Sequence, residues 1–353
     1  MDPNHLLLGD RYLSYYSQAV AEAAGRHMDV VSANFNTFSE QGFLSPSFFD
    51  GLYRAAKRPI MVTEFYFSAM QNASGNKNSK GPFITVKTQR ERAWGAARMA
   101  NTMVDLPYLV GHHWFQFTDE PRDGRGGDGE DFNFGLLDNK NQPYPELVSA
   151  FAAANMAAVA RHKASMGFRV AHAGFLAAAP NLKADGYLGD WNLSDAWLGT
   201  ASGSARSNPF GDFYAAWDAQ GLWVAVEFQD FSAGPSSQTP LLEITALRGN
   251  TSQAFSVTGF AAESKNLAPR LQGAAPRFKP MKLKGQKALQ GSLAYKEGMG
   301  VYALGEIFLS SADLGGALKA GDKLDLKLRL VLKGKGREIN WPGAEKTGML
   351  TLN

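Results

Sequence analysis

A single glutamate interrupts one of the most apolar stretches of the sequence, PIMVTEFYFSAM at residues 59–70. Glu64 follows Thr63 and precedes Phe65 and Tyr66, where a strand-like run ends. A carboxylate is costly to bury unless it is paired or hydrogen-bonded, so this position indicates a functional group. A carboxylate on a rigid strand end, with aromatic rings beside it that can stack on sugars, suits the nucleophile of glycoside hydrolysis.

The first 163 residues alternate between short apolar runs and longer segments with helical spacing. The apolar runs are His5–Leu8, Val30–Ala33, Ile60–Phe67 and Leu109–Phe117, and the helical segments are Tyr15–Arg26, Pro46–Lys57, Thr88–Val104 and Pro145–His162. Strand–helix alternation of this kind predicts a parallel sheet covered by helices.

Polar and aromatic residues collect at the carboxyl end of each predicted strand. They include Arg11, Asn34, Glu64, Tyr66, His113, Trp114, Gln116, Asp119 and Arg125. Such residues converge in the active site of a (β/α) barrel. The competing interpretation is that each is an unrelated strand-end or loop residue in water. A cation in the acidic loop 119–131 is a further alternative, without a fixed ligand spacing.

The pattern changes near residue 164, where helical periodicity gives way to short alternating segments. These are Phe213–Trp217, Leu222–Phe228, Leu241–Leu247, Gly300–Phe308 and Leu324–Leu332, separated by glycine, serine and asparagine. They predict an all-β sandwich. We therefore expect two domains, 1–163 and 164–353, in a chain that is α/β followed by all-β.

Composition excludes several classes of function. The 353 residues carry a net charge of only +3, which gives no reason to expect binding to nucleic acid or to an anionic membrane. Cysteine is absent, so disulfides and thiolate metal sites are excluded. The amino-terminal residues MDPNHLLLGDRY contain no signal-peptide pattern, and no run is apolar for the length of a membrane span. No cofactor or metal is expected.

Residues 1–163 resemble the C-terminal half of a clan-A TIM-barrel glycoside hydrolase, most closely the β-agarases (family 50 type) and then the β-galactosidase-like families. The similar segments are LLLGDRY, VVSANFN, RPIMVTEFYF, LVGHHWFQFTDEPRDGRGGDGEDFNFGLLD and QPYPEL. The resemblance implies four βα units, Glu64 as the nucleophile of a retaining mechanism and Trp114 as a sugar platform. It also implies that Arg11 and Asn34 line the site and that loop residues such as Asp119 and Arg125 border the substrate.

The proton donor of such enzymes follows an asparagine at an earlier strand, and no glutamate here has that setting. The sequence is therefore interpreted as a fragment that is inactive alone and that self-associates through the open half-barrel. The parent would be extracellular or periplasmic and would bind agarose or a related galactan. The alternative function is a non-catalytic carbohydrate-binding protein with a degenerate half-barrel.

The second domain resembles family 9 carbohydrate-binding modules in DGYLGDWNLSDAW, GDFYAAWDAQGLWVAVEFQD and GREINWPG. We expect Trp217 and Trp223 to fill the sandwich core. Trp191 and Trp341 stand beside glycine, aspartate and proline in loop-like sequence. These two tryptophans are therefore the predicted platforms for sugar stacking.

Overall fold

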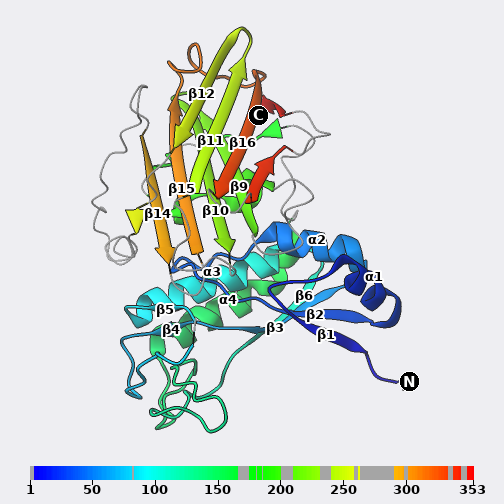
Figure 1. Cartoon of the computed structure of the whole chain (residues 1–353), viewed down its shortest axis with the longest axis vertical. Coiled ribbons are helices and arrows are strands. Elements are labelled where there is room, and N and C mark those ends of the chain that lie inside the picture. The colour runs from blue at the N-terminus through cyan, green and yellow to red at the C-terminus, as the bar shows by residue number, and fades with distance from the viewer. Residues whose placement is uncertain are drawn as a thin grey trace. The chain divides into compact units, whose positions relative to one another are not determined.

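The computed structural model describes residues 4–81, 83–165, 175–179, 181–184, 186–199, 210–230, 240–257, 261–262, 290–297, 301–332, 337–342 and 348–353. The chain divides into two compact units. The first is Met1–Gly167 with Leu267–Ala274, and the second is Phe168–Asn266 with Ala275–Asn353. Helices are concentrated in the first unit and strands in the second (Figure 1).

The first unit contains a four-stranded parallel sheet. Its strands, in spatial order, are β1 (Leu8–Leu13), β2 (Val30–Asn34), β3 (Ile60–Phe65) and β6 (Leu109–Trp114). The helices that alternate with them are α1 (Gln18–His27), α2 (Pro46–Ala56), α3 (Gln89–Asp105) and α4 (Pro145–Ala164). Two short strands, β4 (Ser68–Ala69) and β5 (Thr85–Val86), pair with each other between β3 and α3. The four predicted βα units are thus present.

Side-chain caps mark where α2 and α3 begin. The Ser45 hydroxyl accepts a hydrogen bond from the Phe48 amide, ahead of Pro46 in the first turn of α2. Thr88 and Glu91 form a reciprocal capping box at the start of α3. Each cap satisfies backbone N–H groups that a helix leaves unpaired. In the part of the chain that the structure describes, no helix is long and apolar enough to cross a bilayer.

The first strand differs from its prediction. It was expected at His5–Leu8, with Gly9 to Tyr12 following at its carboxyl end, but β1 runs from Leu8 to Leu13. Tyr12 pairs with Ala33, and the register shifts between Leu8 and Arg11. Glycine and aspartate in sequence favour a turn, but pairing with a buried neighbour strand overrides that local preference. Arg11 is therefore a strand residue.

The two faces of this sheet have different surroundings. Tyr12 and Val62 are buried, whereas Leu13 is 56% exposed and Met61 is only half-buried. Successive side chains of a strand point to opposite faces, so the helices cover one face. The other face carries the candidate site residues.

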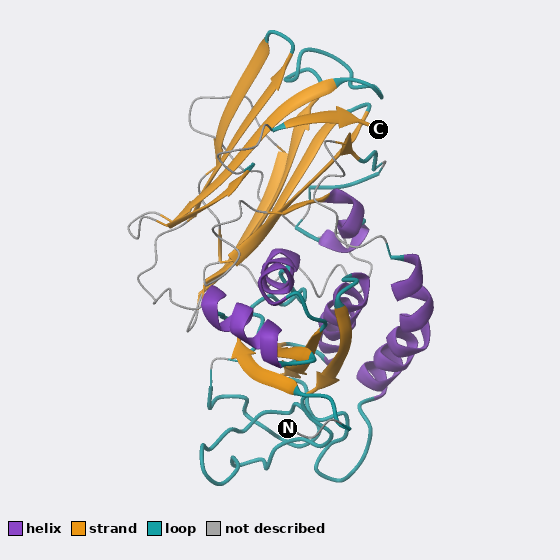
Figure 2. Ribbon diagram, turned by 90° about the vertical axis from the view of Figure 1, so that its right-hand side faces the viewer, coloured by secondary structure: helices purple, strands orange, loops and turns teal. Residues whose placement is uncertain are grey.

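The second unit is a sandwich of two antiparallel-rich sheets (Figure 2). One sheet has the order β13 (Ala261–Ala262), β14 (Gln290–Glu297), β15 (Val301–Ser310), β10 (Gly221–Asp230), β9 (Phe210–Asp218) and β8 (Trp197–Gly199). The other has the order β12 (Thr251–Val257), β11 (Pro240–Arg248), β16 (Lys323–Leu332), β18 (Met349–Leu352) and β7 (Phe175–Leu176), with β17 (Arg337–Trp341) also paired to β16. Two short helical turns, η2 (Leu188–Asp190) and α5 (Leu193–Ala196), precede β8.

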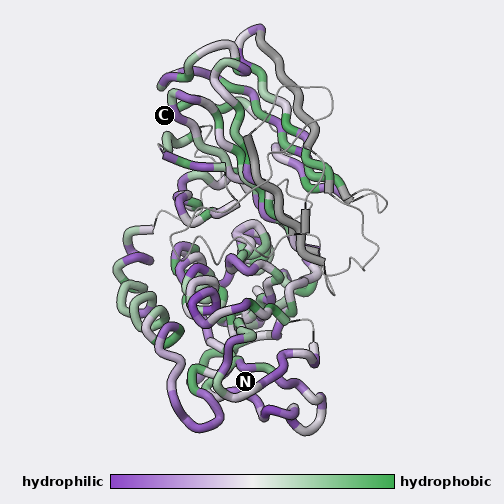
Figure 3. Tube along the Cα trace, turned by 90° about the vertical axis from the view of Figure 1, so that its left-hand side faces the viewer, coloured by the Kyte–Doolittle hydropathy of each residue, from purple (hydrophilic) through white to green (hydrophobic). Residues whose placement is uncertain are grey.

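Apolar residues from both sheets form one core. Val224 and Val226 of β10 belong to the same buried cluster as Ile244 of β11 and Leu328 of β16. Hydrophobic and hydrophilic residues are interspersed along the described strands of the sandwich (Figure 3). They alternate along β16, as expected when one face of a sheet packs inward, whereas every residue of β10 is buried. All five predicted strand segments of this domain are strands, within a few residues at each end.

The structure corrects the expected roles of Trp191 and Trp341. Each is only 7% exposed, like Trp217, and Trp223 is 6% exposed. The indole N–H of Trp191 donates to Glu306 at 2.6 Å, and both groups are buried. Neither tryptophan offers a free face to a sugar.

Trp191 and Trp341 were both predicted to be exposed for the same reason. Glycine, aspartate and proline nearby indicate a loop, but they do not tell whether the tryptophan points outward. Trp191 is buried although its neighbours Asp190 and Asn192 are exposed, because its indole reaches the buried Glu306. Trp341 is the last residue of β17, within the hydrophobic core. Trp217 belongs to the sandwich core, as expected. Trp223 is buried too, but it lies outside that core, on the opposite face of β10 from Leu222 and Val224, and packs against Phe308.

We predict that Trp341→Ala destabilises the sandwich by about 3–5 kcal/mol, because it replaces a large buried side chain with a small one. Thermal unfolding of the 353-residue chain, followed by near-ultraviolet circular dichroism, measures the effect. Met349→Ala is the control, because Met349 is 46% exposed on β18 and should cost about 0.5 kcal/mol or less. Equal melting temperatures for the two variants would contradict the burial of Trp341.

Candidate functional site

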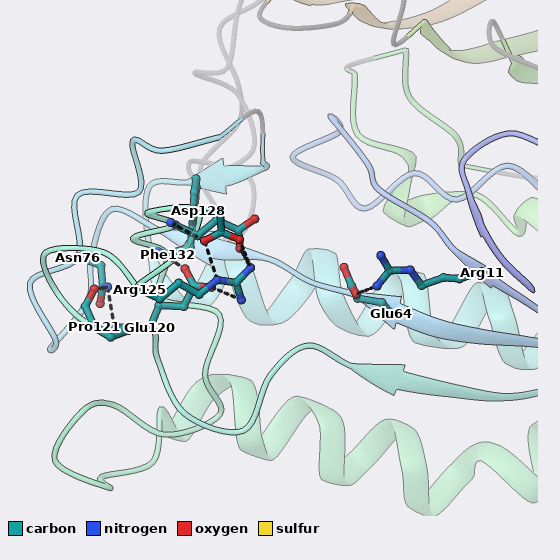
Figure 4. A network of polar contacts seen from close by, with 9 residues as sticks. Arg11, Glu64, Asn76, Glu120, Pro121, Arg125, Asp128 and Phe132 are labelled. Atoms are coloured by element: carbon teal, nitrogen blue, oxygen red, sulfur yellow. Dashed lines mark hydrogen bonds and ion pairs between the residues drawn. The ribbon is translucent and has the colours of Figure 1, made fainter.

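Three neighbouring strands bring Arg11, Asn34 and Glu64 together. Asn34 ends β2 and pairs in register with Glu64 of β3. Nη1 of Arg11, on β1, lies 3.5 Å from Oε2 of Glu64, and the arginine side chain points directly at the carboxylate (Figure 4). The Glu64 side chain is 24% exposed, so it is partly shielded but still reachable from solvent.

A β-bulge aims Glu64. In the pairing with β6, Val62 is opposite His112 and Phe65 is opposite Trp114, so β3 has one extra residue in this interval. A second register shift lies between Ala33 and Asn34 of the pairing with β2. Val62 and Phe65 are both fully buried, so the extra residue lets Thr63 and Glu64 share the less buried face. Bulges of this kind re-aim side chains beside active sites.

Thr63 holds the side chain of Asn34. Its hydroxyl donates to Asn34 Oδ1 at 3.1 Å, and Asn34 is 1% exposed. The buried Nδ2 of Asn34 has no hydrogen-bond partner of good geometry, but the amide is near enough to lower the pKa of Glu64. Burial means that Asn34 does not line the site as a sugar-contacting surface, as was expected. It lies behind the carboxylate.

Opposing influences act on the pKa of Glu64. Burial raises this pKa above the ordinary value and is the largest influence. The charge of Arg11, the Asn34 amide and the more distant charge of Arg125 each lower it, while Glu130 raises it. The surroundings therefore contain three groups that stabilise the ionised form against the cost of burial.

The loop after β6 is organised by one arginine. Arg125 forms ion pairs with Glu120 at 3.2 Å, Asp128 at 2.7 Å and Glu130 at 2.8 Å (Figure 4). Its guanidinium also lies 6.0 Å from the centre of the Phe115 ring. These three ion pairs tie Glu120, Asp128 and Glu130 of the loop to one guanidinium group.

Glu120 is the most perturbed carboxyl group of this cluster. It is 1% exposed, and burial, together with Glu130 beside it, raises its pKa to about 7, against the opposing Phe132 amide and Arg125. The Phe132 amide donates to its Oε2 at 2.8 Å. Glu120 is thus enclosed within the loop, whereas the Glu130 side chain remains 18% exposed.

Tyr66 lies just beyond β3 with its ring buried. It is 3% exposed and packs against Phe134, with ring centres 4.6 Å apart. Its hydroxyl has no hydrogen-bond partner, and burial raises its pKa well above the ordinary value, with added repulsion from Glu64 and Glu130. Tyr66 is therefore close to the acidic cluster, and its ring is not an open stacking surface.

Two further expectations are corrected. Trp114 packs edge-to-face on Phe65 and Phe151, and its indole N–H donates to the Phe134 carbonyl, so its ring faces the helices. Asp119 is 5% exposed and accepts hydrogen bonds from Ser74, Tyr144 and the Gly135 amide. Asp119 therefore holds the loop in place through hydrogen bonds, and its carboxylate is not open to a ligand.

His113 and Gln116 are not brought to Glu64 by any contact in the structure's described portion. His113 is exposed on β6, while His112 is packed against Phe65, with ring centres 5.3 Å apart. Burial lowers the pKa of His112, which favours its neutral form. The backbone of Gln116 is held by Phe134 and Leu136. Substrate contact by His113 and Gln116 stays a prediction.

The sequence analysis missed Arg92. This side chain on α3 is fully buried, and it donates to the Phe67 carbonyl at 2.8 Å and the Gly135 carbonyl at 2.9 Å. Its position four and seven residues before the buried Ala96 and Met99 was a usable signal, because these spacings share one helix face. Helical periodicity around a charged residue could therefore have located it.

No metal site is found among the residues whose structure is described, since no three His, Cys, Asp or Glu side chains are grouped for one. Three carboxylates of the loop, those of Glu120, Asp128 and Glu130, are paired with Arg125 instead.

Comparisons with known proteins connect this chain to agarases. No family model matches it. It is 32% identical over 149 residues to Beta-agarase B of Vibrio sp. (strain JT0107), which covers 42% of this chain and 15% of that protein. The chain therefore spans a small part of the length of this curated relative. A solved exo-beta-agarase is 32% identical, covering 45% of this chain and 20% of its own, with a TM-score of 0.40.

A weaker similarity involves a carbohydrate binding module of family 9 from Caldicellulosiruptor kristjanssonii, solved in complex with cellotriose. It is 15% identical, with a TM-score of 0.30, and covers 51% of this chain and 92% of the module. At these TM-scores neither superposition supports a conclusion about fold. The sequence identity over 149 residues shows that the chain is similar to beta-agarases in that stretch.

We predict that Arg11→Met raises the pKa of Glu64, because the guanidinium charge that lowers it is lost. Titration of the Glu64 carboxyl carbon by NMR measures the change. Since the Arg11 side chain is 62% exposed, the difference from the parent should shrink as salt screens the charge.

Arg54→Met is the matched control for that titration. Arg54 pairs with Asp50 on α2, and its charge does not act on Glu64. An unchanged Glu64 pKa in Arg11→Met, or an equal rise in both variants, would contradict the proposed ion pair.

Proposed function

We propose that the first unit belongs to the catalytic domain of a retaining glycoside hydrolase that acts on agarose or a related galactan, with Glu64 as the nucleophile. The observation that supports this proposal is the position of the Glu64 carboxylate. A β-bulge places it at a strand end, and Arg11 and Asn34 stabilise its ionised form. The similarity to beta-agarases supports the substrate class. The sheet would be four βα units of an eight-unit barrel.

The proposed chemistry uses Glu64 in its ionised form. One carboxylate oxygen attacks the anomeric carbon as the bond to the leaving oxygen breaks, which gives a covalent glycosyl–enzyme ester. Water then attacks the same carbon and releases the carboxylate. Arg11 and the Asn34 amide keep Glu64 charged at the start of this cycle, since both lower its pKa.

Hydrolysis also needs a second carboxyl group, which protonates the leaving oxygen and later activates water. Glu130 acts electrostatically on Glu64, but its carboxylate is held by Arg125 at 2.8 Å. Glu120 is enclosed in the loop. We therefore assign the role of proton donor to neither of these two carboxyl groups of the described loop, and we expect the 353-residue chain alone to be inactive on agarose.

The substrate would be a polymer met outside the cytoplasm, because a polysaccharide of this size does not cross a membrane. An extracellular or periplasmic location of the parent protein follows from that proposal. The rival function, a non-catalytic carbohydrate-binding protein, loses its main support, because Trp191 and Trp341 are both buried.

The nucleophile can be tested without its proton donor. A dinitrophenyl β-galactoside with fluorine in place of the hydroxyl next to the anomeric carbon has a leaving group that departs as an anion. The fluorine slows release of the ester. We predict that the chain forms a covalent adduct on Glu64, seen as a mass increase and located by peptide mapping.

Glu64→Gln is the decisive comparison, because it removes the charge with little change of shape and should abolish the adduct. Glu130→Gln is the matched control and should retain it. Labelling of another residue, or equal labelling of Glu64→Gln, would exclude Glu64 as the nucleophile.

We also propose that the chain self-associates through the edges of its parallel sheet. Leu13 of β1 and Val110 of β6 are each 56% exposed, on strands that pair with only one neighbour within the described residues. Unpaired strand edges with apolar side chains invite association.

We predict that light scattering at rising protein concentration shows species larger than a monomer, and that Leu13→Lys reduces them, because a charge on an edge opposes pairing. Val159→Lys is the control, since Val159 is 67% exposed on α4 and away from either edge strand. A parent chain that stays monomeric throughout would rule out this proposal.

A further inference from the structure

Thr63 and Asn34 form a hydrogen-bonded pair beside Glu64 whose arrangement leaves one donor without a partner. The Thr63 hydroxyl is 3.1 Å from Asn34 Oδ1 and 3.5 Å from the Ala33 carbonyl. Asn34 is 1% exposed, and its buried Nδ2 has no hydrogen-bond partner of good geometry. A buried donor without a partner is costly, so its position requires an explanation.

The Asn34 amide has two orientations, and the hydroxyl selects between them. When Thr63 donates to Oδ1, the NH2 group is turned toward the Glu64 carboxylate. In the flipped amide, Thr63 would accept from Nδ2 and donate to the Ala33 carbonyl, and Oδ1 would then face the carboxylate. Two oxygens with lone pairs repel, so the flipped form disfavours ionised Glu64.

We propose that Thr63 is a positioning residue for Glu64: its hydroxyl fixes the Asn34 amide with the NH2 group toward the carboxylate. The bulge in β3 makes this arrangement possible, because it places Thr63 and Glu64 on the same face of the sheet, with Asn34 of β2 opposite Glu64. The catalytic meaning of the pair depends on the proposed nucleophile role of Glu64, but the hydrogen bonding does not.

The charged and ionisable groups that interact with Glu64, which include Tyr66, can be separated from the effect of Thr63. Arg11 on β1 and Arg125 in the loop after β6 lower the pKa of Glu64, and Glu130 in that loop raises it. In the described part of the chain, Arg11 pairs with Glu64 and Arg125 pairs with Glu130, whereas the Thr63 hydroxyl is bonded to Ala33 and Asn34. A change at Thr63 should therefore reach Glu64 through Asn34 alone.

The test compares Thr63→Val, which keeps the branched shape and removes the hydroxyl, with Thr63→Ser, which keeps the hydroxyl. The pKa of Glu64 is measured in the 353-residue chain by NMR titration of its carboxyl carbon, assigned by comparison with Glu64→Gln. We expect the pKa to rise in Thr63→Val and to stay at the parent value in Thr63→Ser. A purely structural role of Thr63 would not separate the two variants in this way.

A double-mutant cycle tests whether Thr63 acts on Glu64 through the Asn34 amide. In an Asn34→Leu background, Thr63→Val should produce no further rise, because the amide through which it acts is absent. The covalent labelling rate gives a second readout: its loss at acidic pH should begin at higher pH in Thr63→Val, since protonated Glu64 cannot attack. If Asn34→Leu does not fold, the comparison of valine and serine at position 63 still decides the matter.

Equal pKa values in Thr63→Val, Thr63→Ser and the parent would overturn the proposal. A full effect of Thr63→Val in the Asn34→Leu background would overturn it as well. Absence of a Glu64 adduct in the parent chain would instead reject the proposed nucleophile, while the NMR titration would still report on the Thr63–Asn34 pair. The two failures are therefore distinguishable.

Discussion

The buried guanidinium of Arg92 holds together the parts of the first unit that surround the site. It donates to the carbonyl of Phe67, just beyond β3, and to the carbonyl of Gly135, at the far end of the loop after β6. Its charge lies 5.7 Å from the Trp114 ring centre and 5.1 Å from that of Tyr144. Burial lowers its pKa to about 10, which still leaves the group charged at neutral pH. A buried cation of this kind must keep its partners, and so the strand end and the loop keep their relative positions.

Because the strand end and the loop are held in place, Glu64 can be partly buried and still be stabilised in its ionised form. The bulge at Thr63 and Glu64 turns the carboxylate to the open face of the sheet, while Phe65 remains packed among aromatic rings on the helix side. Arg11, Asn34 and Arg125 then oppose the rise in pKa that burial causes. Each comes from a different segment: β1, β2 and the loop after β6. The electrostatic setting of Glu64 is therefore a property of the sheet and the loop together.

In the sandwich, buried carboxyl groups are stabilised by hydrogen bonds from aromatic side chains. Glu306 accepts from the Trp191 indole, Asp212 from the Trp197 indole, and Glu227 from the Tyr302 hydroxyl, and all three acids are fully buried. Aromatic N–H and O–H donors satisfy the carboxyl groups and add apolar contact area at the same time. The aromatic residues that suggested sugar binding are thus used to pack the domain.

The sequence by itself determined the βα alternation of the first unit, the strands of the second and the position of Glu64 at a strand end, because periodicity and a lone carboxylate in an apolar run are local signals. It placed the first strand at His5–Leu8, whereas β1 runs from Leu8 to Leu13 because Arg11, Tyr12 and Leu13 pair with β2. It also read Trp191, Trp341 and Trp114 as exposed platforms. Side-chain direction, the bulge at Thr63 and the buried position of Arg92 depend on contacts between residues far apart in the chain, and these only the tertiary structure decided.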